Sequence, residues 1–203
     1  MGGGVRRVRR PARRWAASWA ALAVVLSGAA ACTDHDKADA PGGDDPGSSA
    51  SDRAQEPIET TVDHVSGHLN GSQRSDLKSG VNEAVDGWFD GAFLGDFPRG
   101  DYTGAFQAFT KGARKAALAD LKLMSNQQIE DRIESSVAGN RRVRLDVLAP
   151  KGKASGVTAH FVLDFFTHGD LEDHRRVRGA LYLTTEEGQW RIFGYDVAGA
   201  ESR

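Results

Sequence analysis

Two ionisable residues interrupt an apolar stretch in the last quarter of the chain and could perform acid–base chemistry. His160 and Asp164 lie four residues apart in a segment whose other residues are mostly apolar. In an extended strand such residues point to the same side, about 13 Å apart at roughly 3.3 Å per residue. That distance excludes a direct pair, but an imidazole and a carboxylate so placed could flank a small substrate and move its protons. The alternative is that both side chains face solvent on the outer side of a sheet.

The densest group of metal-type ligands follows immediately. His168 and His174 enclose three carboxylates, and zinc could use two histidines and one of them. Gly169 followed by Asp170 is also typical of the loop that joins two strands. We therefore expect a solvated hairpin loop here and no metal site.

Tyr102 is a third candidate for a catalytic side chain. The chain has no Gly-flanked nucleophilic serine, no phosphate-binding glycine loop and no His-Glu metalloprotease helix. These absences argue against hydrolase, kinase and protease activity and more strongly against nucleotide binding. No cofactor is predicted.

The only cysteine, Cys32, ends a leader with the three parts of a secretory signal. Six arginines within residues 6–14 precede an apolar stretch and three small residues, 29–31. The apolar stretch is shorter than the roughly 20 residues of a membrane-spanning helix. Residues 1–31 are therefore predicted to be a signal peptide, with the general secretory route and twin-arginine export both open.

The end of this leader resembles the lipobox of bacterial lipoproteins, in which a cysteine after small residues is lipidated on sulfur. The resemblance implies export and a lipid anchor on Cys32 at the extracytoplasmic face of the cell membrane. Ala29 stands where that family usually has leucine. Conventional cleavage after Ala31, which would give a secreted protein, therefore stays open.

Residues 32–56 are predicted to form a disordered acidic linker after the lipidation site. They are rich in Asp, Gly, Pro, Ser and Ala, a composition that cannot bury enough surface to offset chain entropy. Without the six leader arginines, 20 of the 26 Lys plus Arg remain against 28 Asp plus Glu, a net charge of −8. An acidic exported chain argues against a nucleic-acid partner, and a single cysteine argues against disulfides.

The rest of the chain, 57–203, has the length of one domain. An apolar stripe predicts a helix over 75–92, beginning at Ser75 or Asp76. The stripe contains Leu77, Val81, Ala84, Val85, Trp88 and Phe89. Asp101 and Thr110 are predicted to cap two short helices that follow.

Strands are predicted over 143–147, 157–167, 177–184 and 190–197, where apolar residues recur at alternate positions. Glu187 and Gly188 are predicted to close the last hairpin. Helices followed by consecutive strands indicate an α+β domain in which three helices precede an antiparallel meander.

Two parts of this pattern resemble the nuclear-transport-factor-2-like superfamily, which includes SnoaL-like domains. They are the aromatic residues Trp88, Phe89, Phe106 and Phe109, and the closing segment 188–197 with the sequence GQWRIFGYDV. The resemblance implies N-terminal helices packed in a curved antiparallel sheet of four to six strands, a cone-like, cystatin-like roll spanning 57–203. It also leaves open a homodimer formed through the exposed sheet face.

Two functions are consistent with these observations. The first is an envelope-anchored, non-enzymatic accessory or binding domain for an envelope protein or a small apolar ligand, attached to the membrane through Cys32. The alternative is a small-molecule isomerase, dehydratase or cyclase that uses Asp164, His160 or Tyr102 inside the cone. They differ in whether the interior holds an open pocket or is filled by aromatic side chains, namely Trp88, Phe89, Phe106, Phe161 and Phe165.

Overall fold

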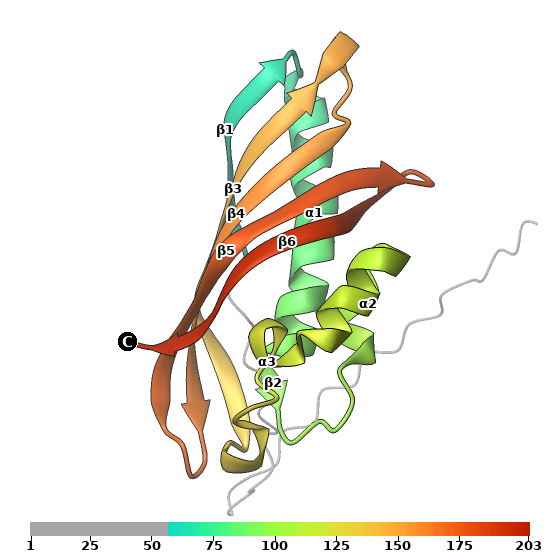
Figure 1. Ribbon diagram of the computed structural model, residues 1–203. Helices are drawn as coiled ribbons and strands as arrows, with labels where there is room; N and C mark the ends of the chain where they lie inside the picture. Colours follow the sequence, from blue (N-terminus) through green and yellow to red (C-terminus); the bar gives the residue numbers. More distant parts are fainter. Residues whose placement is uncertain (1–56) are drawn as a thin grey trace, which may run out of the picture. The chain divides into compact units, whose positions relative to one another are not determined.

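In the computed structural model the described residues are 57–203, and they form an α+β domain with a mixed six-stranded sheet (Figure 1). The signal peptide, Cys32 and the linker lie outside these residues. No helix within 57–203 is long and apolar enough to cross a membrane. The strands are β1 (Glu59–Gly67), β2 (Gly95–Asp96), β3 (Ser135–Ala149), β4 (Gly156–His168), β5 (Asp173–Glu186) and β6 (Gln189–Ser202). The α-helices are α1 (Gly71–Ala92), α2 (Lys111–Ala119) and α3 (Leu121–Met124), and the 3-10 helices are η2 (Thr103–Phe106), η3 (Glu130–Arg132) and η4 (Pro150–Gly152).

The predicted meander is confirmed, and all four of its strands extend beyond the predicted bounds. The strands lie in the order β1-β3-β4-β5-β6, with antiparallel pairing from β3 to β6, and the short β2 pairs with one end of β3. Glu187 and Gly188 form the predicted two-residue turn between β5 and β6, both with positive φ, 52° and 81°. A two-residue turn of this kind matches the twist of the strands that it joins.

The prediction that helices come before any strand is wrong, because β1 precedes α1 and pairs in parallel with β3. The sheet is therefore mixed and not purely antiparallel. The register shifts between Val62 and His64, which indicates a bulge at Asp63. The bulge separates the partly buried Val62 and Val65 by three residues, so the period of two that marks a strand is missing from the sequence.

Helix α1 begins earlier than predicted, at Gly71, and neither Ser75 nor Asp76 caps it. The cap is Asn70, whose side chain accepts a hydrogen bond from the Gln73 backbone N–H, while the Gln73 side chain accepts one from the Asn70 backbone N–H, both at 2.9 Å. This reciprocal pair is a capping box. Thr110 caps α2 as predicted. The predicted cap at Asp101 is wrong, because Tyr102 holds the N-cap position of η2, although Asp101, just before it, accepts a hydrogen bond from the Thr103 N–H.

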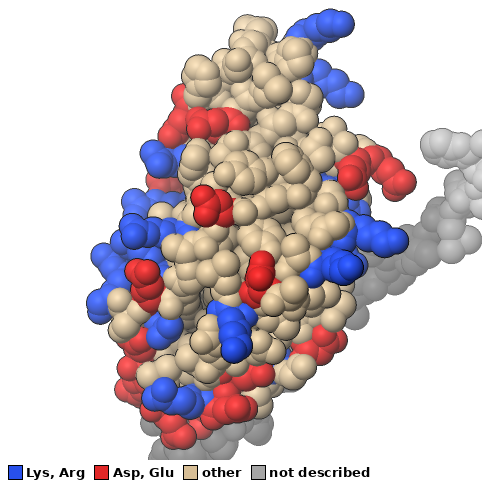
Figure 2. All heavy atoms as spheres, viewed as in Figure 1, with Lys and Arg blue, Asp and Glu red and all other residues tan. Residues whose placement is uncertain are grey.

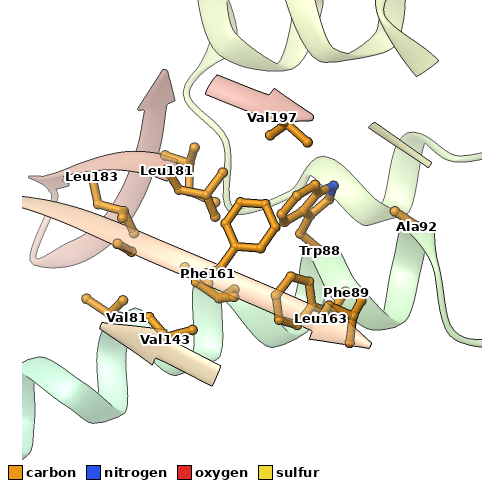
Figure 3. Close-up of a cluster of buried hydrophobic side chains, with 14 of the residues drawn as sticks. Val81, Trp88, Phe89, Ala92, Val143, Phe161, Leu163, Leu181, Leu183 and Val197 are labelled. Atoms are coloured by element: carbon orange, nitrogen blue, oxygen red, sulfur yellow. The ribbon is translucent and has the colours of Figure 1, made fainter. Parts of the chain in front are cut away.

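The core lies between α1 and one face of the sheet (Figure 3). The predicted stripe of α1 is buried in full. Trp88 of α1 meets Phe161 of β4 edge-to-face, with ring centroids 5.2 Å apart, and Phe89 lies 5.7 Å from the same ring. The Trp88 indole N–H donates to the Met124 carbonyl at 3.1 Å, so its polar edge is satisfied although the residue is fully buried. All of these core residues lie within 57–203.

Candidate ligand groove

A groove of about 740 Å³ runs along α1, between the start of η2 and the tip of the β5–β6 hairpin. Its volume is typical of small-molecule sites. The lining residues come from α1 and Leu69 just before it, from η2 and the segment after it, from the segment after η4, and from the hairpin. They are Leu69, Gln73, Asp76, Leu77, Gly80, Glu83, Ala84, Gly87, Gly104, Ala105, Gln107, Ala108, Lys153, Ala154, Thr185, Gly188, Gln189, Trp190 and Arg191.

Small residues form the floor of this groove. Gly80 and Gly87 lie seven residues apart on α1, so they occupy the same side of the helix one above the other. A Cβ atom added at Gly87 or at Gly104 would meet nothing within 4 Å. The lack of side chains at these positions keeps this part of the groove open, and a Cβ atom at Gly87 would enter it without a clash.

Trp190 forms one wall. A Cβ atom added at Gly80 would lie 2.7 Å from Cδ1 of Trp190, so the indole ring rests directly against the helix at this glycine. Gly80 thus allows a close approach between α1 and β6 that no other residue would permit without movement of the ring.

The hairpin wall is tied to the segment after η2 by three hydrogen bonds. Thr110 N–H donates to the Ile192 carbonyl at 2.9 Å, and the Ile192 N–H donates to the Ala108 carbonyl at 2.9 Å. The Arg191 guanidinium donates to the Gln107 carbonyl, also at 2.9 Å. These bonds fix the width of the groove at its hairpin end.

Charged side chains lie on the rim. Asp76 and Glu83 flank Gly80 on α1, four residues before it and three after it, while Lys153 and Arg191 come from the segments on other sides. The rim thus offers both signs of charge around an apolar floor. Among residues 57–203, no histidine, tyrosine, serine or cysteine lines the groove.

His160 lies away from this groove, on the face of the sheet opposite α1. Its Nε2 atom is 3.0 Å from Oδ2 of Asp146 on β3, and both side chains are nearly half exposed. Alternate residues of β4 face the core, as Phe161 does, so His160 points outward.

Asp164 shares the outer face with His160 and is held by an arginine. The Arg176 guanidinium donates to both of its carboxylate oxygens, at 2.6 and 2.8 Å. These hydrogen bonds lower the pKa of Asp164 below its usual value, against the opposing effect of burial. Asp164 is therefore a paired carboxylate, and the structure does not bring it together with Tyr102.

Tyr102 is buried at the start of η2, and its hydroxyl donates to Oε2 of Glu130 at 2.7 Å. Burial and this hydrogen bond both raise the pKa of Tyr102 well above its usual value. The three candidate side chains thus occupy two separate places, neither of them in the groove.

The space between α1 and the sheet is filled by side chains. Trp88, Phe89, Phe106, Phe161 and Phe165 are each at most 2% exposed. Within 57–203 no three His, Cys, Asp or Glu side chains come together as a metal site. In the segment expected to be a solvated loop, the His174 ring stacks on Phe166 with centroids 4.4 Å apart.

Sequence reasoning did not find the groove, because its floor consists of residues that carry no chemistry. One pattern in the sequence does point to it: acidic residues and glycines alternate at spacings of four, three and four along α1. These residues lie on one side of the helix beside the apolar stripe, and they are Asp76, Gly80, Glu83 and Gly87. The residues of η2 and of the hairpin that form the walls are distant in sequence from α1. The spacing along α1 therefore does not indicate which segments lie opposite it.

Comparison with known proteins finds no family model, no curated protein and no solved structure that matches this chain.

Proposed function

We propose that this chain is an envelope-anchored, non-enzymatic binding domain that takes a small, elongated, largely apolar ligand in the groove beside α1. The proposal includes the cone-like form of the nuclear-transport-factor-2-like fold, with α1 in the concave side of the sheet. It also includes export and lipid attachment through Cys32, which lies outside the described residues.

The observation that carries this proposal is the glycine-floored groove itself. Gly87 leaves the helix backbone open at the bottom of a space large enough for a ligand, and Gly80 lets the Trp190 ring approach the helix beside it. Apolar surface there comes from the partly exposed Ala108, Ala154 and Trp190, so an apolar ligand body would be removed from water. The polar rim would orient the ends of such a ligand.

Binding is favoured over catalysis by where the three candidate acid–base residues lie. General acid–base catalysis needs a group within hydrogen-bond reach of the reacting atoms. Asp164 is engaged by Arg176 on the outer face and Tyr102 by Glu130, and neither lines the groove. The isomerase, dehydratase or cyclase alternative would need a different acid or base, such as Asp76 or Glu83 on the rim.

Intrinsic fluorescence tests this proposal, because the chain from residue 33 onward contains only Trp88 and Trp190. Trp190 lines the groove and Trp88 is fully buried. The fragment 33–203, which keeps every described residue, would be titrated with 8-anilinonaphthalene-1-sulfonate, decanoate and decylamine. We expect saturable binding of at least one probe, with a change in Trp190 emission that is absent in the Trp190→Phe variant.

Two glycine variants form the matched pair for this test. Gly87→Leu fills the groove, whereas Gly112→Leu places the same side chain on α2, where a Cβ also meets nothing within 4 Å. Both replace a helical glycine, so neither is expected to lower stability. Binding lost in Gly87→Leu and kept in Gly112→Leu supports the groove; equal binding in the two variants, or no saturable binding of any probe by the wild-type fragment, would rule it out.

The anchor is tested separately on the full chain in a bacterial host. Cys32→Ser is expected to abolish incorporation of radiolabelled palmitate and to move the protein from the membrane fraction to the soluble fraction. Unchanged labelling in the Cys32→Ser variant would contradict the lipid anchor and leave the groove proposal untouched.

A further inference from the structure

A second concave area lies on the outer face of the sheet, on the side opposite α1. Two adjoining hollows of about 460 and 510 Å³ share Arg144, His160 and Val162 in their linings. Arg142 completes the first and Arg178 the second. In Figure 2, viewed as in Figure 1, Lys and Arg side chains gather at the left margin of the domain, beside the strands and away from α2, with acidic side chains among them.

The strand register centres these arginines on Val162. Val162 of β4 is paired with Arg142 of β3 on one side and with Arg178 of β5 on the other. Neighbouring strands lie about 4.8 Å apart, so the two arginine Cα atoms are roughly 10 Å apart across Val162. Arg144 follows Arg142 by two residues and therefore shares its face.

Small side chains line part of these hollows, so the surface is low beside the arginines. Val162 lies between Arg142 and Arg178, while Ala180 follows Arg178 on the same face of β5 and Ala198 of β6 is paired with Arg178. All three arginines are exposed, so their guanidinium groups are free to turn inward over this surface.

The nearby acids do not neutralise all of this charge. The Asp146 carboxylate contacts His160. A guanidinium nitrogen of Arg144 lies 3.7 Å from a carboxylate oxygen of the exposed Asp63. Within 57–203, neither Arg142 nor Arg178 has a carboxylate within 4 Å, although Glu59 lies on the rim of one hollow and Asp196 on the rim of the other. Like charges on one sheet face lower the stability of the fold. We therefore expect a negatively charged ligand to bind to these arginines.

We propose that the face around Val162 binds a phosphate group, held between the guanidinium groups of Arg142, Arg144 and Arg178. Arginine donates pairs of parallel hydrogen bonds that match phosphate oxygens. The phosphate belongs either to a soluble phosphate ester or to a lipid head group. This site is independent of the groove, which lies on the other side of the sheet.

Nuclear magnetic resonance of fragment 33–203 tests the site directly. Inorganic phosphate and glycerol 3-phosphate would be added at constant ionic strength, and sodium chloride would serve as the charge-only comparison. We expect saturating shifts of the Val162, Ala180 and Ala198 signals with phosphate and none with chloride, while Gly87 in the groove stays unchanged. Sedimentation with phosphatidylcholine vesicles, with and without phosphatidylglycerol, tests the lipid source.

The matched variants remove the same charge from two places. Arg142→Gln with Arg178→Gln is expected to weaken binding about tenfold or more. Lys111→Gln with Lys115→Gln, on the exposed side of α2, is expected to leave it within about twofold. Binding of either phosphate source that only the arginine pair weakens supports the site. No binding of either source, the same shifts with chloride, or an equal loss in the lysine pair would overturn it.

Discussion

The two faces of β4 carry side chains of different kinds. Toward α1 the strand presents five apolar residues, each at most 5% exposed. Away from α1 it presents the ionisable residues His160 and Asp164 together with Phe166, which is 43% exposed. One strand thus separates a closed apolar interior from a charged outer surface, and the chemistry-capable residues lie on the outer side.

The difference teaches that polar residues within an apolar strand need not point into a cavity. Because the inner face of β4 is already occupied by Phe161 packed on Trp88, the space between helix and sheet is closed. The open space of the domain lies instead along α1, where glycines replace side chains. The aromatic core and the ligand groove are therefore different regions.

The largest effect is expected on the inner face. Phe161→Ala should lower the free energy of unfolding by about 4 kcal/mol, because it removes a buried ring and leaves a cavity against Trp88. Phe166→Ala, on the outer face of the same strand, should cost less than about 1 kcal/mol. Urea denaturation of fragment 33–203 measures both. Similar losses in the two variants would break the comparison between the faces.

A pH series distinguishes Asp164 on the outer face from Asp86 on α1, because the pKa values of these two carboxyl groups are shifted in opposite directions. The pKa of Asp164 is lowered, chiefly by hydrogen bonds from Arg176, so its charged form contributes stability above the unfolded-state value of about 3.9. That contribution is lost as the pH falls through the lowered pKa. Asp164→Asn should therefore be less stable than the wild type at neutral pH, by less than Phe161→Ala, and this gap should shrink toward about pH 3.

Asp86 of α1 should show the opposite slope. Burial raises its pKa despite the neighbouring Arg141, so the wild type loses stability as the pH rises through that raised value. The stability of Asp86→Asn relative to the wild type should therefore increase from about pH 3 to neutral pH. The measurement is the urea midpoint of each variant along the series, and parallel curves for Asp86→Asn and Asp164→Asn would contradict the assignment.

A smaller effect is expected where α1 meets the groove. Gly87→Ala should stabilise the domain by about 0.5–1 kcal/mol, since alanine is the better helix former and meets no atom. Gly80→Ala should gain less or lose stability, because its methyl group would displace the Trp190 ring. Trp190 emission should shift in Gly80→Ala and not in Gly87→Ala. Identical spectra would mean that the ring does not rest against Gly80.

The smallest effect is expected at His160. Its contact with Asp146 joins two side chains that are nearly half exposed, and exposed pairs of this kind contribute little. His160→Ala should change the free energy of unfolding by less than about 0.5 kcal/mol at neutral pH. If chemical denaturation shows that His160→Ala lowers the free energy of unfolding by more than about 1 kcal/mol, the outer face contributes more to stability than its exposure indicates.

Much of the fold could be predicted because its signals are periodic. The buried stripe from Leu77 to Phe89 and the alternation in β4 follow from regular spacing, and Thr110 marks a helix start by residue type. Strand β1 could not be recognised, since a bulge at Asp63 disturbs its period and few of its residues are apolar. Its parallel pairing with β3 depends on contacts far apart in sequence.

The candidate site was less predictable than the fold for a physical reason. Catalytic and metal-binding residues are recognised by the functional groups they carry, and the attention given to His160, Asp164 and Tyr102 followed from that. A groove floored by Gly80, Gly87 and other small residues is defined by missing side chains, which leave no chemical signature in the sequence.

The parallel strand β1 also determines where the domain is attached to the chain that precedes it. Ile58 is buried, and the next residue, Glu59, is paired with Arg142 in the middle of β3 and lines the hollow there. Any upstream segment therefore leaves the domain at the border of the arginine-bearing face. If that segment is fastened to a surface, the border of this face is the part of the domain that lies closest to the anchor along the chain.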